Sequence, residues 1–262
     1  MTGGIEGRTA IVGGSSTGLG FAVARDLAGR GANVLIVSRS EQRVAAAVGA
    51  IQENGGAAEG CAADFTDPDA PRRVVDRARE LYGTPDIVVA NGGGPPGMPA
   101  TAATAEDLAA ACDLLLLPVQ RFAELTLPAM RASGWGRFVA ITSIAVREPL
   151  PGLVLSNALR AAVTGYLKSV SDEVASDGVT VNTVCPGFTG TDRLGVLAAN
   201  VAERDGVSVD EVFAGWAAQA PVRRLLRPEE VAAAVGFLCS AAASGITGVA
   251  LPVDGGFGRS LI

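Results

Sequence analysis

Short apolar runs alternate with helical patterns along almost the whole chain of 262 residues. Six of these runs lack the polar–apolar alternation that is typical of a strand with one solvent-exposed face, so we predict that they are strands buried on both faces. These runs are 9–14, 33–39, 85–92, 136–143, 179–186 and 248–255. A weaker seventh candidate is 57–64, and helical patterns fill the intervals: 18–30, 41–54, 68–82, 104–132, 155–176 and 227–242. This alternation predicts an α/β fold, a doubly wound parallel sheet of seven strands with helices on both faces.

The pattern contains no linker, repeat or low-complexity tract, so residues 1–262 are expected to form a single domain. Hydrophobic residues make up 48% of the chain and charged residues 18%, which allows a large buried core. The segment 191–226 interrupts the alternation of strands and helices. We expect this segment to be helical and to cover a substrate site, because long insertions after a strand often do so.

Residues 231–253 carry no charge, and their length alone would suit a membrane span. Polar, glycine and proline residues interrupt this stretch, among them Ser244, Gly245, Gly248 and Pro252. A helix to about 242, a turn and a buried strand near 249–253 fit the pattern better, so we expect no membrane partner.

Composition argues against several other classes of function. The net charge is −6, whereas a nucleic-acid surface needs clustered lysine and arginine. The chain has no histidine, which removes the commonest acid–base residue and metal ligand, and we expect no metal site. Cys61, Cys112, Cys185 and Cys239 have no zinc or redox spacing and are expected to be buried thiols in a reducing compartment. The first residues show no signal-peptide pattern, so a cytoplasmic location is expected.

The sequence VGGSSTGLG follows the first predicted strand and opens the first predicted helix. Glycines at this point allow a tight turn, close approach of the backbone to a pyrophosphate, and a helix N-terminus directed at its charge. Placement between strand and helix favours dinucleotide binding on a Rossmann fold over a merely tight turn. The predicted cofactor-binding residues of this loop are Gly14, Ser16, Thr17, Gly18, Leu19 and Gly20.

The second predicted strand ends in Ser38 and Arg39. Sites for the unphosphorylated dinucleotide place an acid near this point to accept a hydrogen bond from the ribose 2′-hydroxyl. A hydroxyl and a guanidinium suit a 2′-phosphate instead, although Arg39 could also be a solvated surface residue. The sequence therefore favours NADP(H) as the cofactor.

Further motifs carry a resemblance to one family: CAADFTD at 61–67, VVANGGG at 88–94, GRFVAITS at 136–143 and VNTVCPGFTGT at 181–191. Together with the spacing G-x-x-x-G-x-G, they resemble the short-chain dehydrogenases/reductases over nearly the whole chain. The resemblance implies a catalytic serine at Ser143 and adenine contacts at Asp64 and Phe65. It implies further cofactor contacts at Asn91, Gly92, Gly93, Pro186, Gly187, Thr189 and Thr191.

The same resemblance identifies three departures from the family's catalytic residues. The family has Tyr-x-x-x-Lys about thirteen residues after the serine, and these positions fall on Ser156 and Arg160. An asparagine is expected 24 residues after Asn91, where this chain has Leu115. We expect Ser143, Ser156 and Arg160 to face the nicotinamide pocket together. Two such family members commonly pair through the helices at 104–132 and 155–176, which implies a homodimer or homotetramer.

The departures change the acid–base chemistry that the family uses. A serine hydroxyl is a weaker acid than a phenol, and an arginine that stays protonated cannot relay a proton. Losing general acid help typically costs about 10²–10⁴-fold in rate. Glu148 and Asp192 are local carboxylates that could substitute, although each also suits a solvated surface. Arg160 could instead hold ribose hydroxyls or bind a substrate carboxylate or phosphate in bidentate fashion.

Three functions remain open at this stage. The first is an NADP(H)-dependent oxidoreductase, similar to 3-oxoacyl reductases, that acts on a small carbonyl or alcohol substrate with an atypical proton donor. The second is a catalytically silent NADP(H)-binding protein that keeps the fold after the site has decayed. The third is a non-redox enzyme such as a dehydratase or isomerase, because a fold does not fix a reaction.

Overall fold

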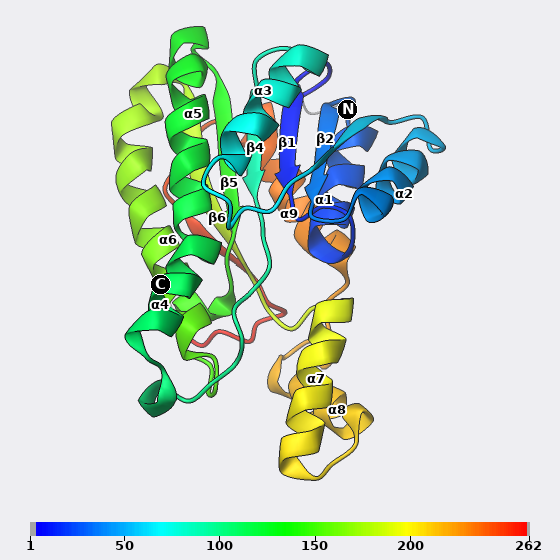
Figure 1. Cartoon of the computed structure of the whole chain (residues 1–262), viewed down its shortest axis with the longest axis vertical. Helices are drawn as coiled ribbons and strands as arrows, with labels where there is room; N and C mark the ends of the chain where they lie inside the picture. The colour runs from blue at the N-terminus through cyan, green and yellow to red at the C-terminus, as the bar shows by residue number, and fades with distance from the viewer. Residues whose placement is uncertain (1–3, 261–262) are drawn as a thin grey trace.

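A sheet of seven parallel strands forms the centre of the computed structural model, which describes residues 4–260 (Figure 1). The strands lie in the order β3-β2-β1-β4-β5-β6-β7, and every neighbouring pair is parallel. All seven predicted strands are present, so the predicted fold class is confirmed; the ends of the expected 1–262 unit lie outside the described residues. The strands are β1 (Thr9–Gly13), β2 (Asn33–Ser38), β3 (Ala57–Ala62), β4 (Ile87–Ala90), β5 (Gly136–Ile141), β6 (Val179–Pro186) and β7 (Ala250–Val253).

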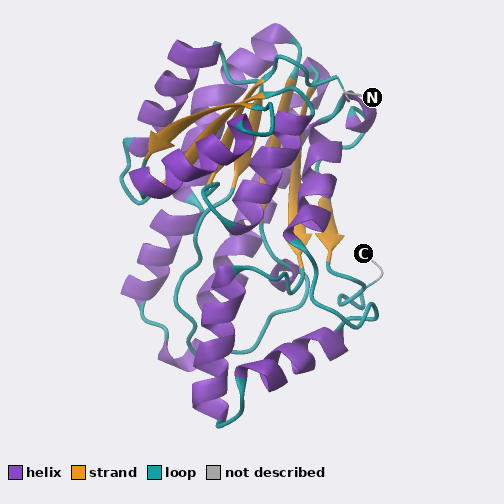
Figure 2. Ribbon diagram, turned by 90° about the vertical axis from the view of Figure 1, so that its right-hand side faces the viewer, coloured by secondary structure: helices purple, strands orange, loops and turns teal. Residues whose placement is uncertain are grey.

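Helices cover both faces of this sheet (Figure 2). One face packs against α1 (Gly18–Gly29), α2 (Glu41–Gln52) and α9 (Pro228–Cys239). The other face packs against α3 (Ala70–Tyr82), α5 (Leu117–Ser133) and α6 (Val154–Val174). Successive residues of a strand point to opposite faces, so Val12 belongs to the first core and Ile11 to the second. Burial on both faces explains why the strands read as continuous apolar runs.

The predicted helix 104–132 is wrong in one respect, because the structure has two helices there. The first, α4 (Ala105–Leu115), begins at a capping box between Thr104 and Asp107. The second is α5, which has Pro118 in its first turn. A proline has no N–H to donate and its ring clashes with the carbonyl of the fourth residue before it, so the helix is interrupted before Pro118, although α5 tolerates Pro128 in its interior.

The segment 191–226 is helical as expected and contains α7 (Asp192–Asp205) and α8 (Val209–Gln219). These two helices project away from the sheet (Figure 1) and pack on each other through Ala198, Ala202 and Val212. The remaining helical turns are short: η1 (Ala100–Ala102), η2 (Ile144–Val146), η3 (Ala175–Asp177) and η4 (Ala241–Ala243). Within residues 4–260, no helix has the length and apolar character that crossing a membrane requires.

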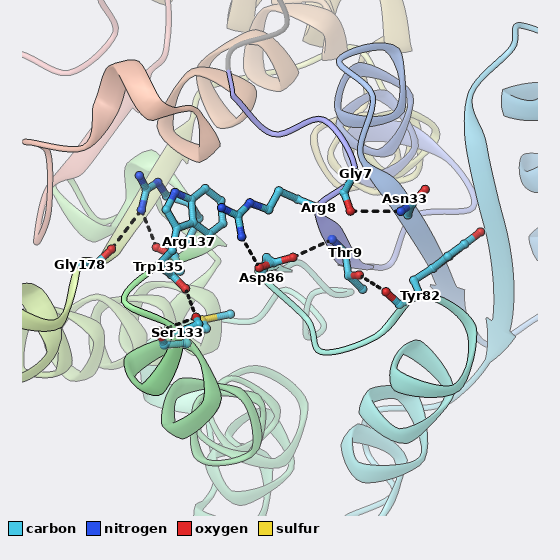
Figure 3. A network of polar contacts seen from close by, with 12 residues as sticks. Gly7, Arg8, Thr9, Asn33, Tyr82, Asp86, Ser133, Trp135, Arg137 and Gly178 are labelled. Carbon is cyan, nitrogen blue, oxygen red and sulfur yellow. Dashed lines mark hydrogen bonds and ion pairs between the residues drawn. The ribbon is translucent and has the colours of Figure 1, made fainter.

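The amino end of the sheet is held by a stack of charged and aromatic side chains (Figure 3). Arg8 forms an ion pair with Asp86 at 2.8 Å, and its Cζ lies 4.0 Å from the centre of the Trp135 ring. The guanidinium of Arg137 lies 4.4 Å from the same ring, and this residue is 2% exposed. Its N–H groups donate to three backbone carbonyls, those of Gly136, Gly178 and Ser240.

The carboxyl end of the sheet is the end that can accept a ligand. The strand order reverses between β1 and β4, since the chain runs outward from β1 to β3 and then returns to continue from β4 to β7. Loops that leave two adjacent strands in opposite directions create a crevice at this point, where ligands bind in open α/β sheets. The residues singled out in the sequence follow the ends of β1, β2, β3, β4, β5 and β6.

Candidate functional site

The glycine loop joins β1 to α1 in a form that requires glycine. Gly14 and Gly18 have φ angles of +55° and +56°, a region that side chains disfavour. A Cβ on Gly20 would lie 2.2 Å from the carbonyl oxygen of Gly14, which is backbone and cannot move aside. Thr17, the residue before α1, makes no side-chain cap, so the first N–H groups of this helix are free to bind an anion.

Ser15 anchors this loop, and the sequence analysis missed it. Its side chain is fully buried, and Oγ donates to the carbonyl of Val12 at 2.6 Å while accepting from the N–H of Val37 at 2.9 Å. The hydroxyl therefore fastens the glycine loop to β2. Ser15 and Ser16 look alike in the sequence, and only the tertiary contact with β2 distinguishes Ser15.

Asn91 ties the two strands at the reversal point together. Its Nδ2 donates to the carbonyl of Gly13 at 3.0 Å, and a Cβ on Gly13 would lie 2.5 Å from the carbonyl oxygen of Asn91. The contact places Asn91 beside the glycine loop, while its predicted role in binding a cofactor stays a prediction. Gly92 and Gly93 follow without any atom within 4 Å of an added Cβ, so this part of the loop borders open space.

The predicted adenine-side residues lie together beyond β2 and β3. The Asp64 carboxylate accepts from the backbone N–H and the hydroxyl of Thr66, at 3.0 and 2.9 Å. These hydrogen bonds, with a smaller contribution from the charge of Arg39, lower the pKa of Asp64. Phe65 packs edge-on against Phe122 with ring centres 5.2 Å apart. Ser38 ends β2, and Arg39 follows it with its side chain exposed.

The loop after β6 lies across the crevice from the glycine loop. The Gly187 N–H donates to the carbonyl of Val253 at 2.9 Å, and Thr189 Oγ1 donates back to the Gly187 carbonyl at 3.0 Å. Thr191 caps α7 with its hydroxyl, and a Cβ on Gly18 would lie 3.5 Å from Thr191 Cγ2. Pro186 ends β6. Thr191 of the loop after β6 therefore lies close to Gly18 of the glycine loop.

Ser156 and Arg160 are in direct contact on the first turns of α6. Arg160 Nε donates to Ser156 Oγ at 3.1 Å. Arg160 Nη1 donates to the carbonyls of Ile141 and Thr142, each at 3.1 Å, which joins α6 to the end of β5. Ser143 is the next residue of that strand end, and its Oγ accepts from the N–H of Ala145 at 3.1 Å. Whether Ser143 and Ser156 act on one substrate stays a prediction.

The guanidinium of Arg160 is mostly used by the protein itself. Its Nη2 also donates to the carbonyl of Gly93 at 3.3 Å, so four of its five N–H groups have acceptors. Among residues 4–260, it forms no ion pair with a carboxylate. Burial lowers the pKa of Arg160 to about 10, so the group remains charged near neutral pH. A bidentate contact with a substrate through Arg160 does not fit this arrangement.

A cavity of about 40 Å³ lies beside Arg160. Leu115, the residue at the position where the family's asparagine is expected, is 7% exposed and belongs to the cavity wall. The wall is mostly apolar, and such cavities stay dry unless several polar partners are present. Other apolar lining residues are Leu114, Pro118, Val119, Phe122 and Val163.

The other candidate acids lie elsewhere or are engaged. Tyr166 packs against the core of the α3, α5 and α6 face, and burial raises its pKa. The carbonyl of Tyr82 accepts from Thr9 at the amino end of the sheet, far from the crevice. Glu148 accepts from the N–H of Arg259 at 2.9 Å, and Asp192 is an exposed residue of the first turn of α7. Within the part of the chain that is described, no cluster of histidine, cysteine or acidic residues could hold a metal.

Residues 14–258 match the family model described as enoyl-(acyl carrier protein) reductase. The chain is 35% identical over 251 residues to the 3-oxoacyl-(acyl-carrier-protein) reductase of Escherichia coli K12, a match that covers 96% of this chain and 97% of the relative. L-sorbose reductase from Gluconobacter frateurii, solved with NADPH and L-sorbose, gives a TM-score of 0.94 at 32% identity over 100% of both chains. A variant of actinorhodin polyketide ketoreductase with NADPH gives 0.93 at 29% identity over 99% of both chains. By these matches, the chain belongs to the short-chain dehydrogenase/reductase family.

Proposed function

We propose that this protein is an NADP(H)-dependent oxidoreductase that reduces a carbonyl group, with Ser156 as the proton donor. One observation carries the proposal: Arg160 Nε lies 3.1 Å from Ser156 Oγ. A guanidinium can only donate, so the serine oxygen must accept this hydrogen bond. The hydroxyl hydrogen of Ser156 is then free to donate to another group.

The residues of the crevice fit a phosphorylated dinucleotide. Gly14 and Gly18 have positive φ angles, the backbone at Gly20 leaves no room for a side chain, and the first turn of α1 is uncapped. Arg39 is exposed at the end of β2, and no acid takes the position that would suit an unphosphorylated ribose. L-sorbose reductase and the polyketide ketoreductase are similar proteins solved with NADPH. When bound, NADPH supplies the hydride; we assign its contacts to Gly14, Ser16, Thr17, Gly18, Leu19, Gly20, Ser38, Arg39, Asp64, Phe65, Asn91, Gly92, Gly93, Pro186, Gly187, Thr189 and Thr191.

Ser156 and Ser143 are the groups of this chain that would meet the substrate oxygen. As negative charge develops there, Ser156 donates its hydrogen bond and then its proton, and water from the open cleft restores that proton. The charge of Arg160 acts through the serine oxygen and stabilises the negative charge, because a preorganised donor needs no rearrangement during the reaction. Leu115 and the apolar cavity exclude a proton path through α4, so the proton must return from the cleft side.

The test is to follow NADPH absorbance against a panel of ketones and aldehydes, with Ser156→Ala beside the wild type. We expect kcat to fall at least about 100-fold in Ser156→Ala, the lower end of the range that general acid help contributes, while the Kd for NADPH is unchanged. Ser169→Ala is the matched control, since Ser169 lies exposed on the same helix. Unchanged kcat in Ser156→Ala would exclude this serine as the donor.

A second candidate function is a catalytically silent NADP(H)-binding protein. It is favoured by the way Arg160 clamps three backbone carbonyls, which serves the fold whether or not a reaction occurs. Fluorescence titration with NADPH separates the two functions: binding without turnover of any carbonyl on the panel supports the silent protein.

The domain organisation and assembly remain proposals. We propose one domain in which α7 and α8 cover the substrate, with Leu194, Phe213 and Trp216 as candidate walls. Trp216 already stacks on Phe188 with ring centres 4.8 Å apart, so its packing role is well supported. We also propose a homodimer or homotetramer, and light scattering at micromolar concentration tests this; a monomer would contradict it.

A further inference from the structure

We infer that the substrate carries an anionic group, a carboxylate or a phosphate, and that Arg193 binds it beside the carbonyl that Ser156 protonates. This inference rests on the proposed carbonyl reduction and adds the chemical class of the substrate. It comes from two guanidiniums, those of Arg160 and Arg193, that meet at the loop after β4. We call them the arginine pair.

The arginine pair contacts two consecutive glycines, Gly93 and Gly94. Arg160 Nη2 donates to the carbonyl of Gly93 at 3.3 Å. A Cβ on Gly94 would lie 2.0 Å from Nη2 of Arg193, so the guanidinium of Arg193 rests directly on this glycine. Arg160 comes from α6 and Arg193 from the first turn of α7, so the pair spans the cleft between the body of the protein and the covering segment.

The arginine pair has no counter-ion within residues 4–260. Every ion pair of the described chain uses other arginines or a lysine. Burial lowers the pKa of Arg193, and its charge in turn helps to lower the pKa of Arg160. Arg193 is exposed as a residue and Arg160 is half-buried, and two neighbouring positive charges with no acid paired to them among residues 4–260 repel each other. An anion bound between them would remove this penalty.

The two members of the pair have different roles. The donors of Arg160 are mostly taken by Ser156 and by backbone carbonyls. Arg193 makes no hydrogen bond to a side chain or to the backbone through its guanidinium among the described residues, so its planar fork is available. Arg193 is therefore the binding residue, and Arg160 adds charge while holding Ser156.

The position of the pair favours the substrate over the phosphates of the cofactor. The uncapped first turn of α1 is where a pyrophosphate would bind, and the residue of the opposite wall nearest to Gly18 is Thr191, not Arg193. Arg193 instead lies on Gly94, next to the glycine that Arg160 contacts, and Arg160 contacts Ser156. The anion is thus expected on the same side of the cleft as the reacting carbonyl.

The experiment compares oxo acids with their methyl esters as probes: pyruvate, acetoacetate and levulinate, each beside its ester. Binding is measured by calorimetry on protein saturated with NADP⁺, which cannot reduce a carbonyl, and again without cofactor. We expect the acid of at least one pair to bind tenfold or more tightly than its ester, as for a charge-assisted hydrogen bond. Arg193→Met should abolish this preference. Arg72→Met, which removes the same charge from an exposed position of α3, should leave it intact.

Two results would overturn the inference. Equal affinity for acid and ester in all three pairs would show that the cleft does not select an anion. A loss of NADP⁺ affinity in Arg193→Met as large as the loss for the acid would assign the charge to the phosphates of the cofactor. NADPH oxidation is recorded separately with the same six compounds. Selective binding without any turnover would reject the proposed reduction and keep the anion site, so the two failures are distinguishable.

Discussion

The two ends of the sheet each hold an arginine that forms no ion pair among residues 4–260, and we propose a ligand site only at the carboxyl end. Arg137 at the amino end donates to three backbone carbonyls and lies against Trp135, whose other face is covered by Arg8 (Figure 3). Arg160 at the carboxyl end also donates to three carbonyls, but its Nε reaches the hydroxyl of Ser156. Hydrogen bonds from a guanidinium to backbone carbonyls therefore do not by themselves indicate a ligand site.

What differs is the surroundings of the charge. At the amino end an aromatic ring and the ion pair of Arg8 with Asp86 close the packing, so Arg137 has no route to a ligand. At the carboxyl end Gly92 and Gly93 border open space, Arg160 holds the Ser156 hydroxyl with its hydrogen free, and Arg193 has no ion pair within the described residues. The comparison predicts that changes at Arg137 act on folding and changes at Arg160 act on catalysis.

The largest effect is expected from Arg137→Met. This change removes the donors for three buried carbonyls and the contact with Trp135, so the free energy of unfolding should fall by about 3 kcal/mol, or about 150-fold in the folding equilibrium. Urea denaturation measures the fall, and kcat per folded molecule should be unchanged. If kcat fell as much as stability, the two ends of the sheet would not be functionally distinct.

Arg160→Met is the converse test. Loss of the charge behind Ser156 should lower kcat by about 100-fold, the lower end of the range of about 10²–10³ for one preorganised electrostatic contact. Stability should fall less than in Arg137→Met, since the carbonyl of Gly93 borders open space, where water can replace the lost donor. A large loss of stability with kcat preserved would instead support the silent binding protein.

The contrast between the two arginines was beyond what the sequence could predict. The six strands other than β3 were predictable because their runs are apolar on both faces, whereas the contact of Asn91 with Gly13 was not predicted. The break before α5 was missed because the apolar pattern of 104–132 continues through it, while Pro118 acts through the backbone of the preceding turn. The partners of Arg160 are set by tertiary approach of α6 to the ends of β4 and β5, which no local pattern records.

Restoring the family's residues tests whether the carboxyl end still accepts the usual chemistry. The variant Ser156→Tyr with Arg160→Lys and Leu115→Asn should create or raise reductase activity on generic carbonyls, by about tenfold, because a phenol is the better acid. Overpacking could defeat the variant, since a hydroxymethyl group now occupies that space. Circular dichroism and NADPH titration therefore accompany the assay. A folded, NADPH-binding variant without such a gain would contradict our assignment of these positions.

Arg39 extends the comparison to an exposed arginine at the carboxyl end, and its predicted effect is confined to cofactor choice, with stability and turnover unchanged. Arg8 at the amino end forms an ion pair with Asp86, whereas Arg39 forms no ion pair within residues 4–260. If Arg39 binds a 2′-phosphate, the wild type should bind NADPH at least tenfold more tightly than NADH. Arg39→Asp should reverse much of that preference, because a carboxylate repels the phosphate and accepts a hydrogen bond from a free ribose hydroxyl. Fluorescence titration with both cofactors measures the ratio of the two Kd values.

Arg43→Asp is the control, since Arg43 is exposed on the first turn of α2 and the substitution changes the net charge equally. Equal Kd values for NADPH and NADH in the wild type, or the same shift in both variants, would mean that Arg39 is a solvated surface charge and that an unpaired arginine at this end does not by itself indicate a ligand.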